Sequence, residues 1–411
     1  MEVHDNQPGK NAMRRFLTCL ALGILVAVVW WLARAPFVVA DLGPGTHLVT
    51  RPNLEFVLVG NAAGEWRVVS REGDSGADGF ALPPGLRGWP ALDSKGDIYA
   101  LHEEKIICLR DGAFLKSVEL PKKSKEEGSG RLWSIDAEDM KLAGVDAADQ
   151  PVLMWLSPEG PRLFVRDVEK ETWQLLAVGD DEAQPAPGLK RDQLLLAPGR
   201  RAVAFPGSDG WEAWVYGSGT VTRRVAEECR GLQAAFSPTG DALIVDGKVK
   251  GLWRLELEEE TLRFMAEGNL GHHDRIPFSV AFRELEPGKE SSVVMAAPQR
   301  DLHGYLQIFQ THLSGGGRWS LGGGAVHHYA PAFSVDGSLL SYVQADFDDS
   351  SSDAPFEDIY LMNLAAPQRG AMHLASRRGG RPGQGPVFVG DGHALVYIAG
   401  GRVKEVKLAD D

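Results

Sequence analysis

The amino-acid sequence predicts an all-β protein built from repeats of a small antiparallel sheet, and three observations lead to this prediction. A strand–turn–strand segment recurs four times without gaps. Its copies start at near multiples of a unit of about 50 residues, which indicates a repeat architecture. Apolar and polar residues alternate over short runs, and glycine is frequent, with 48 in 411 residues. Alternation with a period of two indicates strands, and glycine supplies the turns between them.

The four copies begin at Pro90, Ala234, Pro331 and Pro386 and read "PALDSKGDIYAL", "AAFSPTGDALIV", "PAFSVDGSLLSY" and "PVFVGDGHALVY". In each copy, a short apolar strand leads into a tight turn that ends at a glycine before a second apolar strand. These glycines are Gly96, Gly240, Gly337 and Gly392. We expect a positive φ at each, because so tight a hairpin needs it and glycine adopts it without steric cost. The Asp or Thr before the glycine is expected to tie the turn through its side-chain oxygen.

More divergent copies are expected in the segments that begin at Arg131, Leu194 and Ser279. One or two further strand-like stretches follow each hairpin, as in 251–266 and 358–375. Four short antiparallel strands repeated at this period are typical of β-propeller blades. We therefore predict a β-propeller of about seven four-stranded blades, with six to eight allowed.

The last copy contains only three strands, which would leave an open sheet edge. We predict that a strand from 47–60 completes this blade and closes the ring. If 54–71 forms a blade of its own instead, the count is eight.

An uncharged apolar run, "FLTCLALGILVAVVWWLA" at 16–33, has about the length of a bilayer-spanning helix. Lys10, Arg14 and Arg15 precede it and Arg34 follows it, which favours a cytoplasmic N-terminus and export of the rest. The expected organisation is a cytoplasmic tail at 1–15, a transmembrane signal anchor at 16–33, a linker at 34–45 and the propeller at 46–411. The competing interpretation is a signal peptide cleaved before Asp41. In both cases the remainder is extracytoplasmic.

The exported part is acidic. Residues 1–40 contain four Lys or Arg and two Asp or Glu, so the rest has 39 basic against 54 acidic residues, a net charge of −15. Such a surface repels phosphate backbones, and the sequence therefore predicts no nucleic-acid partner.

Two cysteines follow the apolar run, Cys108 and Cys229. An oxidising compartment would allow a disulfide between them, while the alternating strand-like stretch "KIICLRDG" equally favours a buried free thiol at Cys108. Tryptophan is abundant, and residues such as Trp89, Trp155 and Trp211 are expected mainly in the blade cores.

Histidines occur in pairs at two equivalent places, each before the predicted first strand of a blade. The segments are "GHHDRIP" with His272, His273 and Asp274, and "AVHHYAP" with His327 and His328. First strands line the channel of a propeller, so these residues are candidates for a channel-mouth site. Adjacent residues of a strand point to opposite faces, however, and neither pair can chelate one metal ion alone. Exposed turn histidines are the alternative.

Carboxylates gather in "DFDDSSSD", between the second and third strands of the clearest repeat. Clustered carboxylate oxygens on a loop suit Ca²⁺, although the spacing differs from that of an EF-hand loop. The candidate ligands are Asp346, Asp348, Asp349 and Asp353, and a solvated insertion is the alternative. We expect no other cofactor. No catalytic residue is predicted, because the chain lacks a G-x-S-x-G elbow, and "GDSGADG" at 73–79 is interpreted as a loop.

The segments "FSPTGDALIV", "FSVDGSLLSYV" and "EDIYLMNLAA" resemble the WD40-like repeats of TolB-type β-propellers. The resemblance covers roughly the C-terminal half. It implies a propeller on the periplasmic or extracellular side of a bacterial inner membrane, of a kind that mostly binds other proteins. TolB itself places a small α/β domain before a six-bladed ring and has no anchor, so the resemblance implies fold and compartment only.

Together these features predict a membrane-anchored extracytoplasmic propeller that binds an envelope protein or polymer as a scaffold. An enzyme is less favoured. The alternative function is a lyase or hydrolase that uses His and Asp residues at the central channel.

Overall fold

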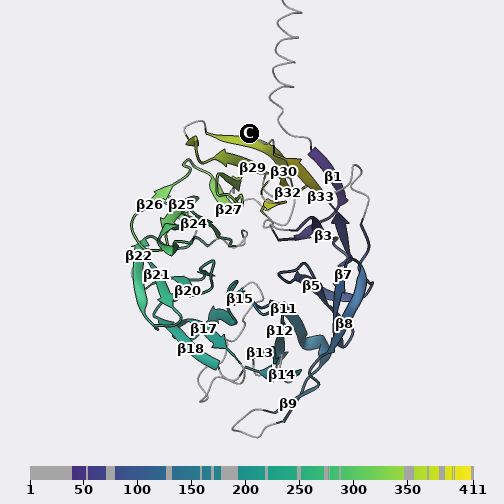
Figure 1. Ribbon diagram of the computed structural model, residues 1–411. Helices are drawn as coiled ribbons and strands as arrows, with labels where there is room; N and C mark the ends of the chain where they lie inside the picture. Colours follow the sequence, from purple (N-terminus) through teal and green to yellow (C-terminus); the bar gives the residue numbers. More distant parts are fainter. Residues whose placement is uncertain are drawn as a thin grey trace, which may run out of the picture.

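Eight sheets form a ring around a central axis (Figure 1). The computed structural model describes residues 39–51, 54–70, 79–125, 132–157, 160–167, 171–176, 193–217, 221–247, 251–272, 276, 278–286, 288–346, 356–367, 370–378, 385–390, 392 and 394–408. Within these ranges the chain contains no α-helix. The prediction of an all-β propeller is confirmed. The number of blades is eight rather than about seven, because 54–71 contributes to a blade of its own.

The blades follow one another in chain order. Blades 1 to 4 contain β2 (His47–Val49), β3 (Phe56–Gly60) and β4 (Trp66–Ser70); β5 (Leu86–Leu92), β6 (Ile98–His102), β7 (Lys105–Arg110) and β8 (Ala113–Glu119); β11 (Met140–Val145), β12 (Pro151–Ser157), β13 (Gly160–Asp167) and β14 (Thr172–Leu175); and β15 (Leu195–Leu196), β16 (Ala202–Pro206), β17 (Gly210–Tyr216) and β18 (Val221–Glu227).

Blades 5 to 8 complete the ring. They contain β19 (Ala234–Phe236), β20 (Ala242–Asp246), β21 (Gly251–Glu256) and β22 (Leu262–Glu267); β23 (Ala281–Glu284), β24 (Val293–Arg300), β25 (Leu306–His312) and β26 (Arg318–Ser320); β27 (His327–Phe333), β28 (Leu339–Ala345), β29 (Phe356–Asn363) and β30 (Ala371–Arg378); and β31 (Val387–Val389), β32 (Ala394–Ala399), β33 (Arg402–Lys407) and β1 (Val39–Pro44). The strands of a blade are called A to D, from the channel outward (Figure 1), and the described residues of blade 1 form strands A to C.

The glycines of the recurring turn adopt the expected conformation. Their φ angles are +87° at Gly96, +74° at Gly240, +70° at Gly337 and +93° at Gly392. The expected side-chain oxygen next to the glycine is found in blade 7, where Asp336 Oδ1 accepts a hydrogen bond from the backbone N–H of Ser338 at 3.1 Å. In three of the turns, a side-chain oxygen three positions before the glycine also ties the turn. Asp93 Oδ1, for example, accepts hydrogen bonds from the backbone N–H groups of Lys95 at 2.9 Å and Asp97 at 2.8 Å. Ser237 and Ser334 use their hydroxyl oxygens in the same way.

Two of the three divergent copies lie where the sequence predicts them, because β15 and β23 start within the segments from Leu194 and Ser279. The third, 131–145, is correct only in its second part. Its first strand, β10 (Leu132–Ser134), pairs with β9 (Lys123–Lys125) in a separate two-stranded sheet. Its last residues form β11, which pairs with β12 as the hairpin of blade 3. Its turn has no glycine, since Asp149 takes the positive φ of +56°, so a search for the glycine pattern misses it.

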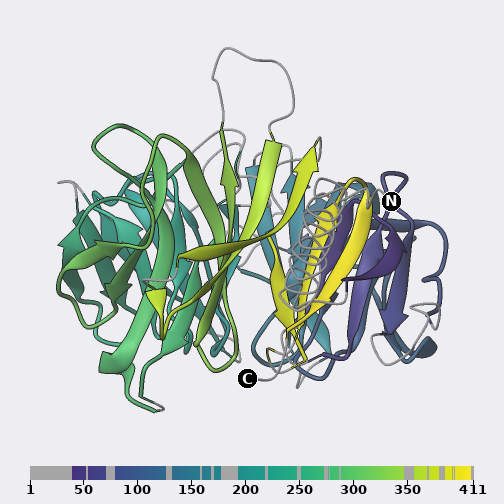
Figure 2. The ribbon, with the colours of Figure 1, turned by 90° about the horizontal axis from the view of Figure 1, so that it is seen from above.

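The ring is closed by the first described strand, β1, which pairs antiparallel with β33 (Figure 2 shows these purple and yellow strands together). The expectation that 47–60 supplies the closing strand is wrong, because those residues include β2 and β3 of blade 1. The propeller therefore includes Val39–Pro44, which lies inside the range expected to be a linker. Leu42 of β1 is 3% exposed and packs in an apolar cluster shared by blades 8 and 1.

The apolar clusters between neighbouring blades include most of the tryptophans predicted in the core. Trp155, Trp211 and Trp214 are at most 2% exposed. Cys108 and Cys229 are both buried as free thiols in different clusters, which excludes a disulfide between them. Burial raises the pKa of Cys229 to about 11.

No helix in the described part of the chain, which starts at Val39, is long and apolar enough to span a bilayer. The predicted anchor at 16–33 lies outside that part.

Two truncated chains test where the propeller begins. A chain of residues 46–411 lacks β1 and should melt about 5–10 °C below a chain of residues 39–411, as differential scanning fluorimetry would show. The physical reason is the loss of buried Leu42 and of the pairing with β33, which together are worth a few kcal/mol. Equal melting temperatures would show that β1 does not stabilise the ring.

Candidate binding site at the channel mouth

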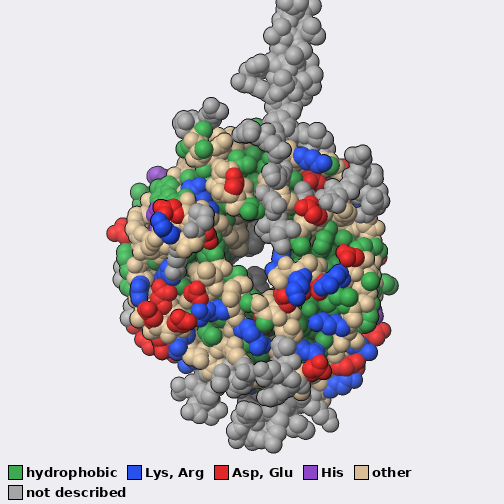
Figure 3. Space-filling model, viewed as in Figure 1, with side chains coloured by type: hydrophobic (Ala, Val, Ile, Leu, Met, Phe, Trp, Pro, Cys, Tyr) green, Lys and Arg blue, Asp and Glu red, His purple; other side chains and the backbone are tan. Residues whose placement is uncertain are grey.

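The ring has two faces with different connections. The turns between strands A and B lie on one face, here called the AB face. The connections from strand D to the next blade, and the B–C turns, lie on the other, here called the DA face. Figure 3 shows the opening at the centre of the ring, with acidic and basic side chains around it.

The second predicted histidine pair lies at the DA end of the innermost strand of blade 7. His327 and His328 belong to β27 and are 7% and 4% exposed. His327 Nδ1 accepts a hydrogen bond from the backbone N–H of Leu306 at 3.1 Å, and His328 Nε2 lies 3.2 Å from Gln344 Oε1. Burial lowers the pKa of His328. The expectation of exposed turn histidines is therefore wrong for this pair, because β27 starts four residues before Pro331.

The remaining predicted site residues are only partly described. His272 is half-buried after β22, and its carbonyl oxygen accepts a hydrogen bond from Arg300 at 2.5 Å. Asp346 is exposed directly after β28. The other predicted residues lie outside the described ranges: His273, Asp274, Asp348, Asp349 and Asp353.

Among the described residues, no three His, Cys, Asp or Glu side chains are grouped to hold a metal ion. Calcium binding by the loop that starts at Asp346 stays a prediction, as does a His and Asp site on the DA face.

A cavity of about 480 Å³ lies on the opposite, AB side of the channel. Four blades contribute to its wall, each through the end of its innermost strand and the turn that follows. The lining residues are Val49–Arg51 from blade 1, Trp89–Leu92 and Ser94 from blade 2, residues 144–147 and Asp149 from blade 3, and residues 196–198 from blade 4. Its size is within the range of small-ligand pockets.

Trp89 lies in a β-bulge of β5, the innermost strand of blade 2. The register of β5 against β6 shifts between Arg87 and Ala91, and Gly88 has a φ of +73°. Trp89 is 37% exposed, so the prediction that it lies in a blade core is wrong. Bulges of this kind re-aim a side chain and occur beside functional sites.

Two neighbouring rings fix the orientation of the Trp89 indole. His47 lies 4.8 Å away between ring centroids and Trp66 lies 5.8 Å away, both in edge arrangements. The indole is therefore held in place before any ligand binds.

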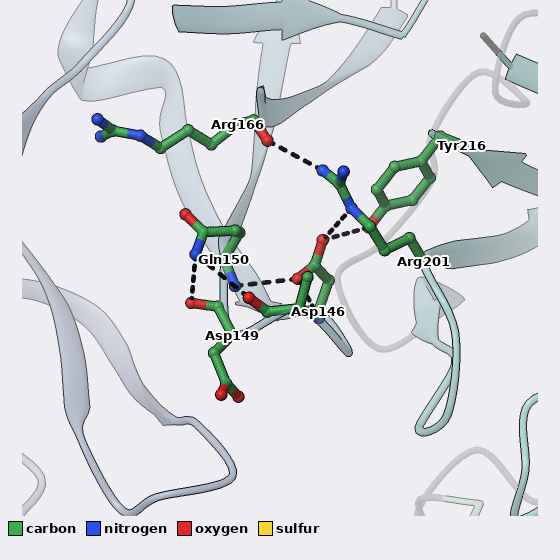
Figure 4. A network of polar contacts seen from close by, with 7 residues as sticks. Asp146, Asp149, Gln150, Arg166, Arg201 and Tyr216 are labelled. Carbon is green, nitrogen blue, oxygen red and sulfur yellow. Dashed lines mark hydrogen bonds and ion pairs between the residues drawn. The ribbon is translucent and has the colours of Figure 1, made fainter. Parts of the chain in front are cut away.

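Asp146 ties blade 3 to blade 4 (Figure 4). Its Oδ2 accepts hydrogen bonds from Arg201 Nε at 3.0 Å and Tyr216 Oη at 3.2 Å. Its Oδ1 accepts from the backbone N–H groups of Ala148 and Gln150, both at 2.9 Å. Burial raises the pKa of Tyr216, so the phenol keeps its proton and donates. The Asp146 side chain is 1% exposed, and these donors compensate the buried charge.

Two further contacts connect the pocket wall across blades 1 to 3. Arg51 donates from NH2 to the carbonyl oxygen of Leu92 at 2.8 Å. Asp149 accepts from the backbone N–H of Ser94 at 3.0 Å and from its hydroxyl at 2.8 Å. The cavity lining thus includes one guanidinium, from Arg51, and one carboxylate that is not paired with an arginine, from Asp149.

Sequence reasoning did not select these residues. The triplet Gly88, Trp89 and Pro90 inside a predicted strand could have signalled the bulge, since glycine and proline both interrupt strand pairing. No comparable local signal marks Arg51, Asp146 or Asp149, whose partners lie in other blades.

No protein-family model and no curated protein sequence matches the chain. Among solved structures, BamB from Moraxella catarrhalis is 12% identical, with 90% of this chain and 98% of that chain covered and a TM-score of 0.49. TolB from Acinetobacter baumannii is 10% identical, with 92% and 81% covered and a TM-score of 0.35. These values support no inference about the site. The ring itself defines the class: an eight-bladed β-propeller, consistent with a TolB-like or WD40-like repeat fold.

The ion pair between the buried Asp146 carboxylate and Arg201 should contribute strongly to the stability of the fold. Asp146→Ala leaves Arg201 and Tyr216 without their acceptor and should lower the free energy of unfolding by about 2–4 kcal/mol in urea titrations. The matched control is Asp241→Ala, because Asp241 pairs with the adjacent Arg200 between blades 4 and 5 but is 44% exposed. It should cost less than about 1 kcal/mol. Equal losses in the two variants would contradict a special role for Asp146.

A second carboxyl, in blade 5, is partly buried and has few hydrogen-bond donors around it. Asp246 ends β20 and accepts one hydrogen bond, from the backbone N–H of Leu270 at 2.6 Å. Burial is the largest cause of its shift and raises its pKa to about 7. The folded state therefore holds a proton that the unfolded chain releases near pH 4.

The stability of the protein should decrease between pH 4 and pH 7 because of Asp246, and the contribution of this group should be constant above about pH 7. Asp246→Asn removes this contribution, so the variant should gain stability relative to the parent at pH 8 but not at pH 4, by at most about 4 kcal/mol. Thermal melts at both pH values provide the measurement. An equal difference at pH 4 and pH 8 would disprove the assignment.

Proposed function

We propose that the protein is an extracytoplasmic propeller that binds a partner protein at the channel mouth on the AB face, as a scaffold module of the cell envelope. The observation that supports this most directly is the cavity built by four blades, with the partly exposed Trp89 among its lining residues. Exposed aromatic side chains in a concave site are typical anchors of protein interfaces.

The wall of this cavity is held rigid before a partner arrives. Hydrogen bonds at the AB turns join blade 1 to blade 2 through Arg51, blade 2 to blade 3 through Asp149, and blade 3 to blade 4 through Asp146. A preorganised surface loses little conformational entropy on binding, which favours affinity. A scaffold role needs such a surface and needs no catalytic group.

The apolar run at 16–33 supports the proposal that the chain is a single-pass protein of the bacterial inner membrane, with the propeller in the periplasm or outside the cell. The anchor would confine encounters to partners at the membrane surface. The net charge of −15 after residue 40 favours partners with basic or neutral surfaces over nucleic acid.

Site-specific photocrosslinking from membranes tests both parts of this proposal. A photoreactive phenylalanine analogue replaces Lys95, which is exposed in the AB turn beside the pocket. In the control protein the analogue replaces Lys105, which is exposed at the start of β7 near the DA face. Membranes are first washed with alkaline carbonate. We expect the full chain to stay in the pellet, and a discrete protein adduct to form from position 95 but not from position 105.

An adduct with a polymer rather than a protein, or equal labelling from both positions, would contradict binding of a protein at the channel mouth. Release of the full chain by carbonate would contradict the anchor.

A further inference from the structure

We propose that the channel-mouth cavity captures the free C-terminus of a partner polypeptide: Arg51 pairs with the terminal carboxylate, and the last side chain, an apolar one, packs on Trp89. This inference rests on the proposed function and specifies the part of the partner that enters the site.

The guanidinium of Arg51 is placed to receive an anion. Its hydrogen bond to the carbonyl oxygen of Leu92 fixes the side chain and uses one of five N–H donors. Among the described residues no carboxylate pairs with Arg51, although the group lines the cavity. Two further arginines lie in the AB turn of blade 4, and both are already paired, Arg200 with Asp241 and Arg201 with Asp146. Among the residues that line the cavity, Arg51 is the one Lys or Arg, and a guanidinium binds a carboxylate through two parallel hydrogen bonds.

The apolar part of the ligand site is next to this charge. Trp89, which is 37% exposed, lines the cavity together with Val49, Leu196 and Pro198. A C-terminal residue carries its carboxylate and its side chain on one carbon atom. It can therefore place both groups in a small pocket that offers a cation and an indole. A cavity of about 480 Å³ holds only the last few residues of a chain, which favours a terminus over a continuous internal strand.

The negative charge of Asp149 in the cavity wall predicts which residue the ligand has shortly before its C-terminus. The Asp149 carboxylate accepts from Ser94, a neutral partner, and no cation pairs with it in the described ranges. It is held on blade 3, whereas Arg51 is on blade 1. A basic residue shortly before the C-terminus of the ligand would pair with Asp149, which also agrees with the acidic charge of the whole chain.

Fluorescence anisotropy with a defined peptide tests the inference on the full-length protein in detergent. The probe is the fluorescein-labelled peptide Gly-Ser-Lys-Gly-Ala-Leu with a free C-terminal carboxylate, compared with the same peptide as a C-terminal amide. We expect the acid to bind about tenfold or more tightly than the amide. An amidated peptide that ends in Asp-Leu distinguishes a side-chain carboxylate from a terminal one and should bind as weakly as the amide.

Four variants assign the contacts. Arg51→Met should abolish the difference between acid and amide, whereas Trp89→Ala should weaken both peptides about tenfold. Arg283→Met is the matched control for Arg51, because Arg283 donates to the carbonyl oxygen of Gly337 at 3.0 Å across blades 6 and 7, away from the cavity. Trp319→Ala is the control for Trp89, since Trp319 is 38% exposed in blade 6. Both controls should bind like the parent.

Equal binding of acid and amide by the parent, or no binding of either up to millimolar concentration, would overturn the inference. A discrimination that survives in a folded Arg51→Met variant, checked by its melting temperature, would also overturn it. Photocrosslinking from position 95 reports the proposed function separately. A partner crosslinked there without any preference for the acid peptide would therefore leave the proposed function intact and remove only terminus capture.

Discussion

The fold depends on one strand pairing at the point where the ring closes. β1 pairs with β33 through residues that are far apart in the sequence, and Arg402 Nε donates to Asp41 Oδ2 at 2.6 Å. Arg67 of blade 1 donates to the carbonyl oxygens of Leu42 and Pro44 and so ties β1 to the next blade. Without this pairing blade 8 would expose an unpaired edge, and the cluster between blades 8 and 1 would be open to water.

Contacts between neighbouring blades determine the geometry of the channel mouth. Apolar clusters between the blades supply most of the burial, but apolar contacts are not directional. Hydrogen bonds are directional, and those that Arg51 donates and that Asp149 and Asp146 accept connect blades 1 to 4 on the AB face at defined distances. The positions of the guanidinium, the carboxylate and the indole in the cavity thus follow from contacts between blades, so that a change in one blade would shift the site formed by its neighbours.

Departures from the repeat mark the residues that build the cavity. Blade 2 has Gly96 at the end of its turn, and blade 3 has Asp149 at the equivalent position. Asp149 adopts a positive φ despite the steric cost, and its carboxylate accepts a hydrogen bond from the Ser94 hydroxyl. In the inner strand of blade 2, Gly88 allows the bulge that exposes Trp89. In a regular repeat, the residues at both positions would contribute to the fold alone.

The sequence by itself determined the all-β class, the recurrent hairpins and the positive φ of their glycines, because these depend on neighbouring residues along the chain. It also determined that most tryptophans are core residues. Tertiary structure alone decided that Val39–Pro44 closes the ring, that Asp149 ends a turn expected to contain glycine, that His327 and His328 are buried strand residues, and that Arg51 and Trp89 share a cavity. The reason is physical: these outcomes depend on packing and hydrogen bonds between blades, and a local pattern of residues contains no information about which distant segment will lie beside it.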